Sequence, residues 1–235
     1  MAAFAALLLD GGAQAAPSHV KACCSFHDPA LEATVREALG VGDGPLTGEA
    51  LASLTSLDAR DRGIKRLDGL QAAASLQALR LSGNHIADLT PLAALDQLEQ
   101  LVVDGNPIAS IDGLEGLASL QVFHADGCSL RSIEAARGWR RLVGITVGHC
   151  ALESLDPLAD IETLKAIWVP SNAIRTVDAI TSLPQLKVLV LGDNPIESLA
   201  PLAGFHALRE LSLDRLRSLE STEGLAAPPL VRLTL

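Results

Sequence analysis

The chain has 235 residues, of which 49% are hydrophobic, so it can bury a sizeable core. Aromatic residues make up only 3% and tyrosine is absent, which indicates a core of Leu, Ile, Val and Ala, as in stacked repeats. The net charge of −10 argues against a nucleic-acid partner, and no apolar run reaches the roughly 18 residues that suggest a membrane-spanning helix.

Residues 1–25 support two interpretations. An apolar run over residues 2–9 precedes residues 13–15, Ala-Gln-Ala, which have the small-x-small pattern of a signal-peptide cleavage site. No Lys or Arg precedes Lys21, so the positive region that normally opens a signal is missing. The segment is either an export signal or a disordered tail. The first interpretation places the protein outside the cytoplasm, as a secreted, periplasmic or cell-surface protein, and the second leaves it cytoplasmic.

A helical cap is expected over residues 26–53. Asp28 can serve as the N-cap of a first helix with Pro29 at its first position, and Gly40 can close it. One face of this helix carries the apolar residues Leu31, Val35, Ala38 and Leu39. Thr47 begins a second short helical stretch. A cap is needed because the open core of the first strand would otherwise meet water.

Residues 54–235 repeat with a period of 22 residues over eight units and a terminal strand. The period is marked by Leu54, Leu76, Leu98, Leu120, Leu142, Leu164, Leu186, Leu208 and Leu230. The unit over residues 98–117, LEQLVVDGNPIASIDGLEGL, and the unit over residues 186–205 both match LxxLxLxxNxIxxLxxLxxL. Self-similarity at so short a period indicates a solenoid of stacked units.

Each unit is expected to contribute one strand and one return segment. Leu101 and Val103 are two residues apart and face the core, which leaves Val102 on the other face. The turn asparagines Asn84, Asn106, Asn172 and Asn194 can donate to and accept from nearby backbone. The three-residue apolar rhythm that follows suits 3₁₀ or irregular segments. Stacking then produces a curved α/β solenoid, with a parallel sheet on its concave face and the return segments on its convex face.

These repeats resemble the leucine-rich repeats. The 22-residue length is similar to that of the subclass found in the protein phosphatase 1 regulatory subunit and in bacterial internalins. Residues 26–53 resemble the helical amino-terminal cap of bacterial internalin-like proteins, so the resemblance covers residues 26–235.

Some units depart from the pattern. Cys128 and Cys150 replace the asparagine in successive units, which predicts two buried thiols about 4.8 Å apart, a spacing that also permits a disulfide. Trp139 occupies an inward position that usually holds Leu, while Ala136 replaces the preceding Leu, an exchange that conserves volume. The absence of CxxC spacing argues against a structural zinc site, and no cofactor is predicted.

Trp168 lies between the inward positions Ile167 and Val169, so it should project from the concave face. Together with its neighbours it predicts an exposed apolar patch, a common mark of a protein-binding site, although a solitary surface tryptophan is the alternative. The predicted partner-binding residues are Trp168, Val190, Val188, Thr146, His124, Val102, Asp104 and Asp126. Charges flank this surface, with Lys165, Lys187 and Arg209 at strand starts and Asp104, Asp126, Asp193 and Asp214 near strand ends. As a set they would orient a partner more than hold it.

We therefore expect a non-catalytic module that binds a partner protein on its concave face. The alternative that the resemblance allows is an intracellular regulatory subunit of an enzyme such as a protein phosphatase. A third function, a metal-dependent enzyme, would need His124, Asp126 and His149 to act together. A flat concave sheet offers no dry pocket, however, and no HExxH, P-loop or nucleophile-elbow motif occurs.

The carboxyl-terminal segment repeats the strand pattern at Leu230, Leu233 and Leu235, with no visible cap after it. Such a strand leaves backbone groups unpaired, so we expect either a longer protein or end-to-end association through this strand.

Overall fold

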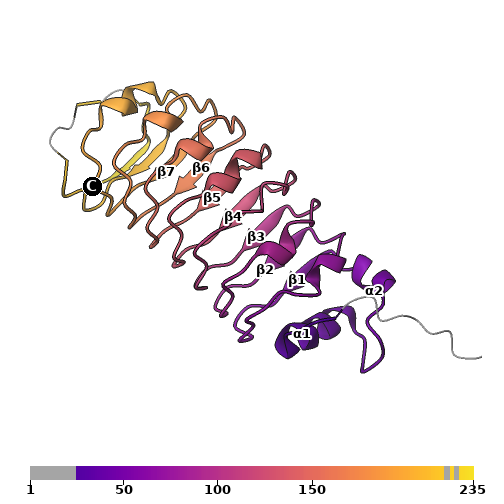
Figure 1. Cartoon of the computed structure of the whole chain (residues 1–235). Coiled ribbons are helices and arrows are strands. Elements are labelled where there is room, and N and C mark those ends of the chain that lie inside the picture. The colour runs from indigo at the N-terminus through magenta and orange to yellow at the C-terminus, as the bar shows by residue number, and fades with distance from the viewer. Residues whose placement is uncertain (1–24, 220–222, 225–227) are drawn as a thin grey trace, which may run out of the picture.

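The computed structural model describes residues 25–219, 223–224 and 228–235. The predicted signal or tail therefore lies outside the described residues, apart from residue 25. In the described part the repeats stack side by side in sequence order, with the helical cap at one end and the carboxyl terminus at the other (Figure 1).

Nine short parallel strands form one sheet in the order β1 to β9. Their bounds are β1 (Ser56–Asp58), β2 (Ala78–Arg80), β3 (Gln100–Val102), β4 (Val122–His124), β5 (Gly144–Thr146), β6 (Ala166–Trp168), β7 (Val188–Val190), β8 (Glu210–Ser212) and β9 (Arg232–Thr234). Each strand pairs with the next at an offset of one repeat, for example Leu79 with Leu101. The sequence period is thus also the register of the sheet, and the predicted curved solenoid is confirmed.

The return segments contain short 3₁₀ helices, as the three-residue rhythm predicts. These are η1 (Leu70–Ala72), η2 (Thr90–Leu92), η3 (Glu134–Gly138), η4 (Asp156–Leu158), η5 (Asp178–Ile180) and η6 (Ala200–Gly204). Their buried side chains, which are leucine or isoleucine in most and alanine in η3, join the inward residues of the strands in one continuous hydrophobic core.

Trp139 fills the middle of this core, as predicted from its inward position. It is fully buried, and its ring centroid lies 4.9 Å from that of Phe123 in β4. The indole Nε1 donates a hydrogen bond of 2.8 Å to the carbonyl oxygen of Leu114 in the preceding repeat. The bulky side chain therefore packs on an aromatic ring of its own repeat and joins the preceding repeat by a hydrogen bond.

A ladder of asparagine side chains holds the buried turns, as predicted. Asn106 donates to the carbonyl oxygens of Leu81 and Val103, both at 2.9 Å, and its Oδ1 accepts from the backbone N–H of Ile86 at 3.0 Å. Asn84, Asn172 and Asn194 make the corresponding contacts between their own repeats. Each amide therefore satisfies backbone groups of two adjacent repeats that the turn would otherwise leave unpaired.

Cys128 and Cys150 occupy the same ladder and are both free thiols. The sulfur of Cys128 lies 3.6 Å from the carbonyl oxygen of Val103, and that of Cys150 lies 3.4 Å from that of Ala125, so each thiol replaces one amide contact. Burial raises the pKa of Cys128 to about 11. The prediction of two buried thiols holds for Cys128, whereas Cys150 is only half-buried.

The cap consists of α1 (Pro29–Leu39) and α2 (Gly48–Ala52). Asp28 and Thr47 are their N-caps, and Gly40 closes α1 in the left-handed conformation, all as predicted. The predicted apolar face of α1 is wrong at Ala38, which is exposed, while Thr34 is buried in its place. Thr34 tolerates burial because its hydroxyl donates to the carbonyl oxygen of Ala30 at 2.7 Å.

Candidate interaction surface

The outward residues of the strands form two parallel rows on the concave face of the sheet. Trp168 pairs in register with Thr146 on one side and with Val190 on the other. Among the described residues, the exposed large hydrophobic side chains are Val41, Trp168, Val231, Leu233 and Leu235. Of these, Val41 lies in the cap and the last three lie in or beside β9. On strands β1 to β8 of the described sheet, the exposed large hydrophobic residue is therefore Trp168, whose exposed fraction is 37%. Its predicted outward orientation is confirmed.

A hollow of about 260 Å³ opens beside Trp168 on this face. Trp168, Val188 and Val190 provide its apolar side, and the two valines are half-buried. Its polar side comes from β8 and β9, where Arg232 lies 3.5 Å from the carboxylate of Glu210. The hollow can receive an apolar side chain between an indole ring and an ion pair.

Several residues of the hollow were missing from the predicted site, namely Glu210, Leu211, Ser212, Arg232 and Thr234. The signal that could have found the outward residues among them is the repeat itself. The two outward rows continue at intervals of one period through β8 into β9, in register with Val188 and Val190. The hollow therefore lies further toward the carboxyl-terminal end than the predicted set suggests.

Three predicted residues lie on the outward rows but do not line the hollow. Thr146 is the neighbour of Trp168 on β5, and His124 and Val102 follow in the same row on β4 and β3. All three are half-buried. They extend the surface toward the cap without contributing to the concavity beside Trp168.

Asp104 and Asp126 lie at the turns that follow the strands, where contacts between repeats occupy their carboxylates. Asp104 Oδ1 accepts from the backbone N–H of Asp126 at 2.8 Å, and Ser82 Oγ lies 3.4 Å from Asp104 Oδ2. Asp126 Oδ1 lies 3.1 Å from Nδ1 of His149. These aspartates connect neighbouring turns within the solenoid.

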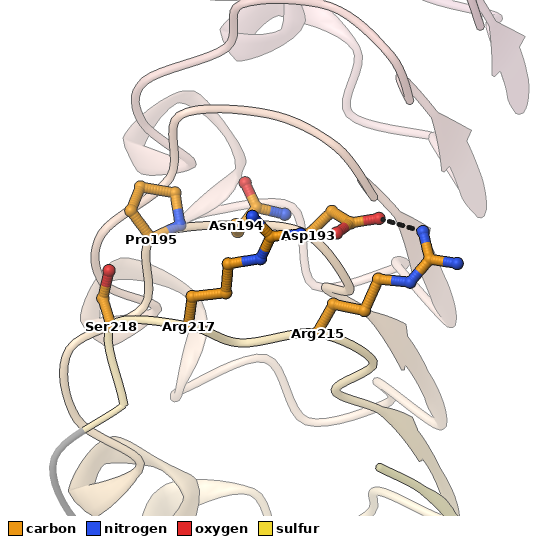
Figure 2. Close-up of a pocket in the computed structure, with 6 residues that line it drawn as sticks. All are labelled: Asp193, Asn194, Pro195, Arg215, Arg217 and Ser218. Carbon is orange, nitrogen blue, oxygen red and sulfur yellow. Dashed lines mark hydrogen bonds and ion pairs between the residues drawn. The ribbon is translucent and has the colours of Figure 1, made fainter.

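A second hollow, of about 400 Å³, lies at the turns of the last two full repeats. Figure 2 shows Arg215 and Arg217 extending from one turn toward Asp193 and Asn194 of the preceding repeat. Arg215 Nη1 lies 3.3 Å from the carboxylate of Asp193. The arginine side chain is largely exposed and the aspartate partly exposed, so this ion pair adds little stability and mainly links the two turns.

The metal-site hypothesis joined His124, Asp126 and His149. The structure brings Asp126 and His149 together on neighbouring turns, as described above, whereas His124 lies on β4. No group of three or more His, Cys, Asp or Glu side chains in the described part of the chain is placed to hold a metal ion.

Comparison with known proteins identifies the architecture. A family model described as Leucine Rich repeats (2 copies) matches residues 74–118. The structure is similar to that of internalin C2 from Listeria monocytogenes, with 29% sequence identity and a TM-score of 0.64, covering 80% of this chain and 94% of that chain. The chain thus has the architecture of a leucine-rich repeat solenoid, and its similarity to this internalin extends over nearly all of that chain.

Two further structures share the fold. An internalin from Listeria monocytogenes is 20% identical, with a TM-score of 0.68, and the match covers 88% of this chain and 76% of that one. A leucine-rich repeat protein from Leptospira interrogans is also 20% identical, with a TM-score of 0.66, covering 80% of this chain and 52% of that one. No curated protein matches the sequence. No helix among residues 25–219, 223–224 and 228–235 is long and apolar enough to cross a membrane.

Proposed function

We propose that the protein is a non-catalytic interaction module that binds a partner protein on its concave face. The observation that carries this proposal is Trp168, which is exposed within the sheet and borders a hollow together with Val188 and Val190. Tryptophan is enriched at the energetic centre of protein interfaces, where a large rigid ring is desolvated against a partner. The leucine-rich repeat fold supports the proposal because its stacked strands create an extended concave surface.

Substitution of Trp168 tests the proposal. We expect Trp168→Ala to weaken partner binding by about 2 kcal/mol, roughly thirtyfold in Kd, while stability stays nearly unchanged. The matched control is Val41→Ala, which shortens an exposed apolar side chain in the cap, away from the sheet. Affinity capture with the parent and both variants, followed by mass spectrometry and titration of the captured protein, makes the comparison. Equal affinities for all three proteins would remove the site, and a large loss of stability in Trp168→Ala would show a structural role instead.

The location of the protein follows as a second part of the proposal. The small-x-small pattern at residues 13–15 and the similarity to internalin C2 support an exported or surface-associated protein. Sequencing of the mature amino terminus tests this, because cleavage near Ala15 is expected for export and an intact terminus for the cytoplasmic regulatory alternative.

We also propose that β9 contacts further polypeptide, either a second copy of the protein or an additional segment of a longer one. Val231 and Leu235 beside this strand are largely exposed, and Leu233 within it is 40% exposed, although its counterpart Leu211 in β8 is buried. Exposed apolar strands at the edge of a sheet are common sites of pairing with another chain. Hydrogen exchange together with the mass in solution tests this. A strictly monomeric protein whose residues 230–235 are as protected as the central strands would contradict it.

A further inference from the structure

We propose that the partner segment bound on the concave face is acidic, and that a row of cations at the starts of β6, β7 and β8 recognises it. This inference rests on the proposed function and names the chemistry of the partner. The row consists of Lys165, Lys187 and Arg209, each of which directly precedes its strand. The backbone N–H of Lys187 donates to the carbonyl oxygen of Lys165, and that of Arg209 donates to Lys187, so the three residues lie side by side.

The cations of this row lack carboxylate partners within the described part of the chain, although the protein as a whole is acidic. Among the described residues, arginines pair with carboxylates elsewhere, at Arg36, Arg60, Arg62, Arg66, Arg137, Arg175, Arg215 and Arg232. Lys165 and Lys187 are exposed and make no side-chain hydrogen bond or ion pair within the described chain, and the side chain of Arg209 donates only to the carbonyl oxygen of Pro229, at 3.1 Å. The row therefore presents unmatched positive charge.

The segments that lead into these strands reinforce the charge of the row. Residues 162–165, 184–187 and 206–209 contain one carboxylate, Glu162, against the three cations. With neighbouring strands about 4.8 Å apart, the cations span about 10 Å along the sheet. That spacing suits two or three carboxylates of a partner segment that crosses the strands.

The row also lies next to the apolar hollow. Lys187 is followed by Val188, which lines the hollow, and Arg209 is followed by Glu210 on the hollow's polar side. On the opposite edge of the sheet, by contrast, the carboxylates of Asp126 and Asp193 already have His149 and Arg215 as partners. Unmatched charge is thus available on the strand-start edge, so a partner would place an apolar side chain beside Trp168 and its carboxylates toward the cations.

Defined peptides test the inference without knowledge of the natural partner. The probes are three fluorescein-labelled peptides of roughly twelve residues, long enough to cross several strands. The first has a Leu-Phe-Leu centre flanked by glutamates, the second has the same centre flanked by lysines, and the third has glutamate flanks around a serine centre. Fluorescence anisotropy measures their affinities for the parent protein. We expect the first peptide to bind about tenfold more tightly than either of the others, with a preference that weakens as salt rises.

Charge reversal at the row provides the decisive comparison. We expect Lys165→Glu combined with Lys187→Glu to weaken binding of the glutamate-flanked peptide at least about tenfold and to strengthen binding of the lysine-flanked one. The matched control is Lys65→Glu, which reverses an exposed lysine near the cap and should change neither affinity. Urea unfolding of each variant verifies that the fold is retained.

The outcomes separate this inference from the proposed function. Trp168→Ala could weaken the binding of both peptides with the apolar centre equally, while the charge reversals leave their affinities unchanged. In that case the concave site stands and the acidic partner is wrong. If the charge reversals act but Trp168→Ala does not, the proposed centre at Trp168 is wrong. Absence of binding by every peptide would overturn both. Charge-dependent binding to phosphatidylserine vesicles, with no binding of the acidic peptide, would replace the acidic protein segment with an anionic membrane surface.

Discussion

At the scale of single residues, Asp28 joins the cap to the first repeat. Its Oδ1 accepts from the backbone N–H groups of Ala30 and Leu31 in α1, while its Oδ2 accepts from those of Lys65 and Arg66 in the first repeat at 2.7 and 3.1 Å. Burial alone would raise the pKa of this carboxyl, but the four donated hydrogen bonds outweigh it and lower the pKa. One ionised side chain therefore starts a helix and attaches it to the solenoid.

Substitution of Asp28 should loosen the cap in a pH-dependent manner. We expect Asp28→Ala to lower the free energy of unfolding by about 2–3 kcal/mol near neutral pH, since an N-cap and charged hydrogen bonds between elements are lost. The folded pKa lies below the unfolded value of about 3.9, so this stabilisation is complete above that pH and is lost as the pH falls through the folded pKa.

Urea unfolding of the parent and Asp28→Ala over a range of pH measures this effect. The difference between the two proteins should be constant near neutrality and shrink below about pH 4. Asp43→Ala, at an exposed loop position of the cap, is the control and should have little effect at any pH. A difference that persists unchanged in acid would show that the ionised carboxylate is not what holds the cap.

At the scale of elements, the turn after each strand depends on one left-handed residue per repeat. The series is Asp61, Gly83, Gly105, Gly127, His149, Ser171, Asp193 and Arg215, with φ from 50° to 70°. In the members from Asp61 to Asp193, the backbone N–H donates to a carbonyl oxygen of the next repeat, as Gly105 does to Asp126 at 2.8 Å. The left-handed residue thus extends the ladder of backbone hydrogen bonds beyond the three-residue strands. Because glycine occupies only some of these positions, the sequence alone does not mark the feature.

Two glycine-to-alanine substitutions, one at this turn and one in a strand, test whether the cost of a side chain at the turn is backbone strain or a steric clash. Gly105→Ala should lower the free energy of unfolding by about 1–2 kcal/mol, because an L-residue is strained at φ +64°. An added Cβ would meet nothing closer than 3.8 Å, so the cost is conformational and not a clash. Gly144→Ala in β5 is the control, since its backbone is not left-handed and its surroundings are open. It should leave stability unchanged or raise it by up to about 1 kcal/mol. Equal losses in the two variants would contradict this account.

At the scale of the whole molecule, each repeat contacts mainly its neighbours, so stability depends on the interfaces between adjacent repeats. Trp139 lies at one of the central interfaces, where its indole contacts Phe123 of its own repeat and donates a hydrogen bond to the carbonyl oxygen of Leu114 in the preceding repeat. Most ion pairs between repeats, such as Arg175 with Glu197, are exposed and add little. The two halves of the solenoid are thus coupled mainly through the hydrophobic core at its centre.

Loss of the central tryptophan should uncouple the two halves. We expect Trp139→Ala to cost about 3–5 kcal/mol and to divide unfolding into two transitions. Trp168 is then the one tryptophan left in the sequence, so its fluorescence reports on the later repeats, while hydrogen exchange follows the cap and the early repeats. Trp139→Phe keeps an aromatic ring and should retain more of the coupling. A single transition with coincident probes in Trp139→Ala would show that cooperativity does not depend on this interface.

The sequence by itself determined the fold. The 22-residue period and the alternation of inward and outward residues can be read within each repeat, and the fold follows when similar units stack. The same alternation correctly placed Trp168 outside and Trp139 inside. Helix capping at Asp28 and Gly40 was equally readable, since it depends on residues within a few positions of each other.

Only the tertiary structure decided which outward residues act together. The hollow beside Trp168 extends to Arg232, the aspartates at the turns bind their neighbours, and Lys165 and Lys187 have no such partners in the described chain. These outcomes depend on side-chain directions and on distances between residues one or more repeats apart, which a repeat pattern leaves open. The sequence therefore predicts which residues form a row across the sheet. Which charges in that row lack a partner depends on the positions of neighbouring side chains, which the structure provides.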